Sequence, residues 1–338
     1  MTNEKKLIGV KNEAVEKACK DFQFYLERYD LVANVTALQT RRNKVSLGGK
    51  DDNCRFCDVS KTDGDFKKEA HALPQLVGNF SLFSCYECDN CNGRFGKFEE
   101  DLSSFLHLKR IVGGIKGKTG IPSYKTFQKL SRIDSSLSNG MHIKEYKDDR
   151  IIGLNEETKT LTLKVTSHPY RPLGVYKALL KSAVTILPPE FLIDLPQAVE
   201  WLKYDDLDTG KIDDGTGYTC IESFTAGPRP INNVRALIFK RKEGIFDCPN
   251  MVFILAFGNH SYQIFMPCPE KDKELVGKNI ILSPIPVFQF LSEERTKGST
   301  TYNRLCLSSD KKESLPLIAT MSYESSQELS EQENTIVK

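Results

Sequence analysis

The stretch that decides the interpretation of this chain reads Cys54-Arg-Phe-Cys57, then Glu69-Ala-His71-Ala-Leu-Pro74, then Cys88-Asp-Asn-Cys91-Asn92. Two Cys-x-x-Cys pairs can supply four thiolates to one tetrahedral zinc ion. Thirty residues (58–87) separate the two pairs, which exceeds the roughly 15–20 residues of a simple two-pair zinc module. The insert therefore has to build structure of its own, and His71 is its one histidine.

The composition of the whole chain is that of a soluble globular protein. Its 338 residues are 39% hydrophobic and 27% charged, and this length suffices for two ordinary domains. No run of about 18 apolar residues occurs, so we expect no membrane span. Residues 1–6 are polar and lead into no apolar segment, so we expect no signal peptide and a cytoplasmic location. In a reducing compartment, paired cysteines bind metal more often than they form disulfides.

The ordered set of motifs resembles the HNH family of ββα-metal endonucleases, and in particular the branch with a four-cysteine zinc site. In that family the cysteine pairs flank a β-hairpin and a helix. A His-x-x-Pro lies at the end of the first strand, and an asparagine follows the last cysteine. His71, Pro74 and Asn92 match these positions. The resemblance covers residues 54–100 and implies a small zinc-stapled ββα-metal nuclease domain.

The resemblance also implies a role for each matching residue. His71 would be the general base, because a histidine with a pKa near neutrality can take the proton from an attacking water. Asn92 would hold a catalytic divalent cation, Mg²⁺ or Mn²⁺. Such a cation neutralises the charge that develops on a scissile phosphate. Magnesium prefers oxygen ligands and keeps several waters, so few protein ligands are needed.

Cys85 leaves the zinc ligands open between two overlapping pairs, Cys85 with Cys88 and Cys88 with Cys91. We prefer the second pair because Asn92 then directly follows the last ligand, as the resemblance implies. The predicted ligands of the structural zinc ion are Cys54, Cys57, Cys88 and Cys91.

The acidic ligand of the catalytic cation is the open part of this assignment. The family usually has an acidic residue directly before the histidine, but here that position is Ala70. Glu69 lies one residue earlier, and it would point the same way as His71 because residues i and i+2 share one face of a strand. Glu69 could therefore orient His71 or reach the cation. Glu99, seven residues after Asn92, would lie on the same face of the helix two turns on. We expect Glu69 or Glu99 to provide the carboxylate.

A basic, glycine-rich stretch follows the motif region. Residues 107–132 include no acidic residue. Because Lys and Arg make most contacts with phosphate, this stretch is a candidate nucleic-acid contact. The alternative interpretation is a solvated loop without a partner. The residues predicted to contact nucleic acid are Lys109, Arg110, Lys116 and Lys118.

Periodic apolar patterns predict an α+β fold in which the small nuclease domain is joined to a larger domain with antiparallel strands. The predicted elements are helices at 11–29, 175–187 and 195–204, a hairpin at 151–165, and strands at 234–240, 251–257 and 262–266. The predicted domains are an N-terminal helical segment (1–50), an HNH nuclease domain (51–132), an α+β regulatory or targeting domain (133–307) and a disordered tail (308–338) rich in Ser, Glu and Gln.

Two functions from different classes follow from these residues. The resemblance implies a metal-dependent endonuclease that hydrolyses phosphodiester bonds in DNA. The alternative is a zinc-stabilised nucleic-acid-binding module that does not cleave, which the alanine at position 70 motivates. We expect the long C-terminal region to regulate or target the nuclease through a partner protein or signal, as in a prokaryotic anti-phage defence effector. This last expectation rests on analogy of architecture.

Overall fold

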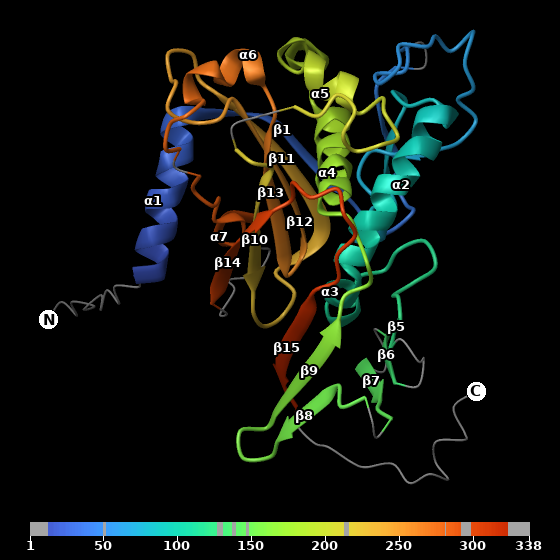
Figure 1. The fold of residues 1–338 in the computed structure, drawn as a ribbon, viewed down its shortest axis with the longest axis vertical. Coiled ribbons are helices and arrows are strands. Elements are labelled where there is room, and N and C mark those ends of the chain that lie inside the picture. Colours follow the sequence, from blue (N-terminus) through green and yellow to red (C-terminus); the bar gives the residue numbers. More distant parts are fainter. Residues whose placement is uncertain are drawn as a thin grey trace, which may run out of the picture.

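The computed structural model has an α+β fold whose sheets are mainly antiparallel (Figure 1), as predicted for the fold class. Within the part of the chain that the structure describes, no helix has the length and apolar character needed to span a bilayer. The described residues are 13–49, 52–126, 131–136, 140–146, 149–212, 216–280, 282–291 and 299–323.

The largest sheet has six strands, all paired antiparallel in the order β1-β11-β12-β13-β10-β14. Strand β12 is an apolar run whose eight residues are all buried, which is typical of a strand covered on both faces. Strand β1 comes from the start of the chain, yet it pairs with β11, where Tyr29 lies opposite Arg241. The strands are β1 (Tyr29–Ala37), β10 (Thr219–Thr225), β11 (Ile231–Arg241), β12 (Met251–Gly258), β13 (His260–Met266) and β14 (Thr300–Cys306).

Alternate residues of this sheet face two different helical layers. In β11, Ala236 and Ile238 belong to the apolar cluster that contains the residues of α4. Leu237 and Phe239 belong to a second cluster, which contains Tyr25 of α1. Because side chains alternate between the faces of a strand, α4 covers one face of the sheet and α1 the other (Figure 1). The helices of these layers are α1 (Glu13–Arg28), α4 (Pro172–Ile186) and α7 (Val287–Leu291).

Helix α4 is buried along its whole length, and α2 (Asp89–Phe105) packs against it. Gly174 permits this close approach, because a Cβ atom there would clash with the carboxylate of Asp101 on α2. That carboxylate accepts hydrogen bonds from the backbone N–H and the side-chain Nε of Arg171, each at 2.9 Å. Arg171 is the N-cap of α4. These bonds therefore fix α2, which begins at two of the predicted zinc ligands, to the start of α4.

A small three-stranded sheet directly precedes α2 in the sequence. Its middle strand β4 pairs antiparallel with β3, where His71 lies opposite Phe83, and parallel with β2. Asn79 closes the loop between β3 and β4. Its side-chain N–H groups donate to the carbonyl oxygens of Leu73 (2.7 Å) and Leu82 (2.8 Å). The chain thus passes through two antiparallel strands into a helix. The strands are β2 (Val45–Leu47), β3 (Ala70–His71) and β4 (Leu82–Ser84).

Two further three-stranded sheets, β15-β9-β8 and β5-β6-β7, surround a third apolar cluster. Leu163 and Val165 of β9 and Ile133 of β6 pack there with Ile111 of α3. The strands are β5 (Tyr124–Lys125), β6 (Arg132–Ser136), β7 (Gly140–Lys144), β8 (Ile152–Asn155), β9 (Thr160–Thr166) and β15 (Pro316–Ser322). The short helices are α3 (His107–Val112), α5 (Pro196–Trp201), α6 (Pro269–Asp272), η1 (Gln75–Val77), η2 (Pro189–Asp194) and η3 (Lys273–Leu275).

The elements with long periodic patterns lie where the sequence predicts them. Helices α1, α4 and α5 occupy the predicted helical ranges, β8 and β9 form the predicted hairpin, and β11, β12 and β13 occupy the predicted strand positions. We expected disorder from residue 308 on, but Pro316–Ser322 form strand β15. Its alternating Leu317, Ala319 and Met321 pack on the third apolar cluster and pair it with β9. The part of the predicted tail from residue 324 on lies outside the described residues.

Segments that we predicted as separate units share one apolar core. The cluster on the α4 side of the large sheet includes Ala37 of β1, Phe95 of α2 and Phe253 of β12. These three residues come from three different predicted domains. The predicted boundaries at residues 50 and 132 therefore do not separate hydrophobic cores.

Candidate metal centre and the neighbouring charged site

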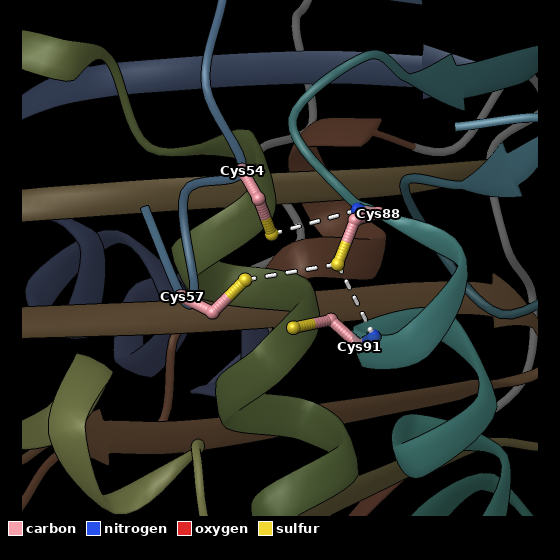
Figure 2. Close-up of side chains that lie close together, drawn as sticks. All are labelled: Cys54, Cys57, Cys88 and Cys91. Carbon is pink, nitrogen blue, oxygen red and sulfur yellow. Dashed lines mark hydrogen bonds between the residues drawn. The ribbon is translucent and has the colours of Figure 1, made fainter. Parts of the chain in front are cut away.

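Four cysteines gather at the start of α2 (Figure 2). Cys54 and Cys57 lie at the turn between β2 and β3, Cys88 is the N-cap of α2, and Cys91 lies in the first turn of that helix. Their four Sγ atoms all lie within 4.8 Å of one another. Cys85 lies outside this cluster, so the cluster has the four predicted members.

The geometry of the cluster is compatible with a structural zinc ion. A tetrahedral site with Zn–S distances of about 2.3 Å places its sulfurs about 3.8 Å apart, and the Sγ atoms of Cys57 and Cys88 lie 3.7 Å apart. The backbone N–H of Cys88 donates to Sγ of Cys54, and that of Cys91 donates to Sγ of Cys88, each at 3.5 Å. Such N–H groups stabilise thiolates, which are the form that binds metal.

The four thiols also oppose one another's ionisation. A hydrogen bond from Cys91 lowers the pKa of Cys54 to about 4. The same contact with Cys54 raises the pKa of Cys91, and burial raises the pKa of Cys88 to about 11. One negative charge is therefore favoured in the cluster and further charges are opposed. A divalent cation would offset this repulsion and allow all four sulfurs to ionise.

Arg55, between the first two cysteines, joins the cluster to α4. Carbonyl groups in the last turn of a helix have no partner within the helix. The Nη1 atom of Arg55 donates to three carbonyl oxygens at the end of α4, those of Val184 (2.7 Å), Thr185 (3.0 Å) and Leu187 (2.7 Å). Its guanidinium also lies 3.7 Å from the centroid of the Tyr86 ring. Arg55 therefore fixes the turn that contains Cys54 and Cys57 to the C-terminal end of α4, the helix that packs on the large sheet.

His71 ends strand β3, and its ring packs against that of Phe83 with 4.7 Å between the centroids. Burial, together with the positive charge of Lys181, lowers the pKa of His71 to about 4. The carboxylate of Glu69 acts in the opposite direction. The imidazole is therefore neutral near pH 7, which is the form that accepts a proton.

The two candidate carboxylates lie in different surroundings. Glu69 is exposed, and its oxygens lie 2.6 and 2.9 Å from Nζ of Lys44, which lowers the pKa of Glu69. Glu99 is half-buried on α2, and burial raises its pKa. Asn92 is half-buried in the first turn of the same helix, where its backbone N–H donates to the carbonyl of Cys88 (2.9 Å).

Glu87, Glu99 and Lys181 form a buried charge cluster where β4, α2 and α4 meet. Nζ of Lys181 lies 2.9 Å from Oε2 of Glu87, and these side chains are 3% and 0% exposed. Burial raises the pKa of Glu87 despite the nearby ammonium. Glu99 interacts electrostatically with both residues. One ammonium thus faces two carboxyl groups, and burial raises the pKa of both. Glu87 and Lys181 are not among the site residues predicted from the sequence.

Two of the four residues predicted to contact nucleic acid have partners inside the protein. Nζ of Lys109 lies 2.6 Å from Oε1 of Glu222, and the lysine side chain is 17% exposed. Arg110 is 6% exposed. Lys116 and Lys118 are exposed on the loop after α3, so they are the members of the predicted set that face solvent.

A groove of about 190 Å³ lies beside β3 and β4. Lys61, Lys67 and Lys68 line it together with Glu69 and Phe83. Sequence analysis missed these lysines because the segment that contains them also contains several acidic residues. Their only sequence signal is their closeness to the predicted histidine.

No protein-family model matches the chain, and no curated protein or solved structure matches it. What is shown for this region is an α+β fold with a four-cysteine cluster that is compatible with a structural zinc ion.

Proposed function

We propose that residues 54–100 form a metal-dependent HNH endonuclease site that hydrolyses phosphodiester bonds in DNA. The observation that carries this proposal is the arrangement of the candidate metal centre. The four cysteines hold the start of α2, and the antiparallel strands β3 and β4 precede that helix, with His71 at the end of the first. This order of strand, strand and helix matches the one that the HNH resemblance implies.

His71 is the general base in this proposal. A base must be unprotonated before the reaction, and the lowered pKa of His71 keeps its imidazole neutral at pH 7. Nearby positive charge from Lys181, Arg41 and Lys44 contributes to this lowering. Of these three residues, Arg41 is exposed and would also attract a phosphodiester. The lysine-lined groove beside β3 gives the nucleic-acid backbone a second place to bind.

Glu99 and Asn92 are the proposed protein ligands of the catalytic cation, Mg²⁺ or Mn²⁺. The cation, when bound, would stabilise the charge that develops on the phosphate. Burial raises the pKa of Glu99, so a cation bound beside it would favour its ionised form. Glu69 is the alternative carboxylate, but Lys44 already neutralises it.

The role of Glu99 is tested by the metal dependence of plasmid nicking. We expect the wild type to nick a plasmid with Mg²⁺ or Mn²⁺ and not with EDTA. Glu99→Gln removes a proposed ligand charge, so it should raise the Mg²⁺ concentration at half-maximal rate by about tenfold or more. Glu100→Gln is the matched control, because Glu100 is exposed on the same helix. Equal Mg²⁺ requirements for the two variants would contradict the assignment of Glu99.

The second candidate function is a zinc-stabilised nucleic-acid-binding module without cleavage. Ala70 in the expected acidic position and the ion pair of Glu69 with Lys44 favour it. Salt-dependent DNA binding without nicking under either metal would support this alternative. We further propose that residues 133–307 regulate or target the nuclease through a partner or signal. We also propose that the protein is an anti-phage defence effector. Both proposals rest on analogy alone.

A further inference from the structure

Lys181 is a buried lysine whose two partners come from another part of the chain. Its Nζ atom donates to the backbone carbonyl of His71 at 3.1 Å and lies 2.9 Å from Oε2 of Glu87. Lys181 belongs to α4, whereas His71 ends β3 and Glu87 directly precedes α2. A buried ammonium is costly unless it is paired and hydrogen-bonded. The lysine is thus held by the region of the candidate site.

Strand β3 is short. It has two residues, and its ladder with β4 has two pairs, Ala70 with Ser84 and His71 with Phe83. A ladder this short is weak by itself. The hydrogen bond from Lys181 acts on the carbonyl of the same residue that carries the imidazole. Loss of this bond would therefore move the backbone from which the proposed base projects.

Lys177, one turn earlier on α4, shows that burial alone does not create this link. Its Nζ atom donates to the carbonyl oxygens of Trp201 (2.9 Å), Tyr204 (3.0 Å) and Asp206 (3.1 Å). All three partners lie in the segment after α4, and none belongs to β3. Both residues are buried lysines of α4, but their ammonium groups bind different segments of the chain.

We propose that Lys181 is a positioning residue, which holds the His71 backbone in place and makes α4 part of the catalytic unit. This inference rests on the proposed nuclease function. It assigns the region after residue 132 a direct part in the site, because that region supplies the donor that holds the base.

A set of three variants separates positioning from simple charge pairing. Lys181→Met removes the donor and leaves Glu87 as a buried, unpaired carboxylate, so it can unfold the protein for a reason unrelated to the site. Glu87→Gln keeps the donor to His71 and removes the charge pair. The double variant Lys181→Met with Glu87→Gln removes the donor and leaves no unpaired charge. Zinc content and melting temperature show which variants are folded.

We expect Glu87→Gln to keep a kcat close to that of the wild type. The double variant should be folded and zinc-loaded, with kcat lowered by about 10- to 100-fold and KM nearly unchanged, because a displaced catalytic group loses rate more than binding. Lys181→Arg keeps a charged donor and should retain more activity than the double variant. Lys177→Met should lose stability without this loss of kcat.

Recovery of both stability and wild-type kcat in the double variant would overturn the proposal, because Lys181 would then act only as a charge partner. A folded Lys181→Arg variant as slow as the double variant would overturn it as well, because arginine keeps a charged donor. Amide hydrogen exchange distinguishes this failure from failure of the nuclease proposal. Even if the wild type cuts no DNA, positioning predicts faster exchange of the Ala72 amide in the double variant than in Glu87→Gln, and equal exchange contradicts it.

Discussion

Ala70 occupies the position where the HNH resemblance implies an acidic residue, and its side chain is 2% exposed. Of its two possible substitutes, Glu69 is exposed and paired with Lys44, whereas Glu99 is half-buried and its pKa is raised by burial. A desolvated carboxylate without a full partner gains more from a bound cation than one that is already neutralised. The environment of the two carboxyl groups therefore favours Glu99 over Glu69 as the ligand of the catalytic cation.

Glu222 gives the fold a pH-dependent contribution to stability. Burial raises its pKa, but the neighbouring His260 and the ammonium of Lys109 outweigh burial and lower the pKa to about 2. The unfolded chain has the ordinary glutamate value of 4.5. The ionised carboxylate therefore stabilises the fold fully above pH 4.5, and this contribution is lost as the pH falls from 4.5 towards 2. The contribution of the ionised carboxylate to the free energy of unfolding is at most about 3 kcal/mol.

Glu222→Gln tests this contribution. The free energy of unfolding should be lower in the variant than in the wild type at pH 7, and the difference should shrink as the pH falls below 4.5. Glu100→Gln, which changes an exposed carboxylate, should show little difference at any pH. A difference for Glu222→Gln that stays constant from pH 7 to pH 3 would show that ionisation of Glu222 does not stabilise the fold.

At the scale of elements, the cysteine cluster is expected to hold the first turn of α2 through a zinc ion. The purified protein should contain about one zinc per chain, because four thiolates complete a structural site. Cys54→Ser should lower the zinc content and unfold the region around α2, since binding free energy at such a site is folding free energy. Elemental analysis and thermal denaturation measure the two effects.

The matched control for the zinc prediction is Cys306→Ser. Cys306 is an exposed cysteine on β14, far along the chain from the cluster. Its replacement should leave the zinc content and the melting temperature nearly unchanged. A wild-type protein that is fully folded without metal would refute the structural role of zinc.

Elements with a strong local pattern could be predicted from the sequence, and those that depend on distant partners could not. Helix α4 and strand β12 are long apolar runs, so their patterns suffice. Strand β1 has a mixed pattern of buried and exposed residues, and it is a strand because β11 pairs with it. Strand β15 also depends on a distant partner, because it forms by pairing with β9.

The candidate site divides in the same way. The four cysteines could be predicted because each pair is a local motif, and the cluster has the predicted members. The contacts of Arg55, Glu87 and Lys181 could not, because each depends on the docking of α4 against the cysteine turns and α2. A sequence pattern reports neighbours along the chain, whereas these side chains find their partners across the fold.

At the scale of the whole molecule, the site is built on a continuous core. Strand β1 precedes the cysteine region in the sequence and joins the large sheet beside β11, while α4 packs between that sheet and α2. The region after residue 132 therefore supports the candidate site directly, through the contacts of α4 with Arg55, Asp101 and Glu87. Regulation by a partner or signal would have to act through this shared core.

The cleavage rate of a plasmid under saturating Mg²⁺ tests the claim that this chain is a nuclease with His71 as its base. A positioned general base contributes about 10²- to 10⁴-fold to a rate, so His71→Ala should slow nicking by that factor. His142→Ala should nick at the wild-type rate, because His142 is an exposed histidine on β7. Equal rates for the wild type and His71→Ala, or no nicking by the folded, zinc-loaded wild type with either Mg²⁺ or Mn²⁺, would contradict the claim.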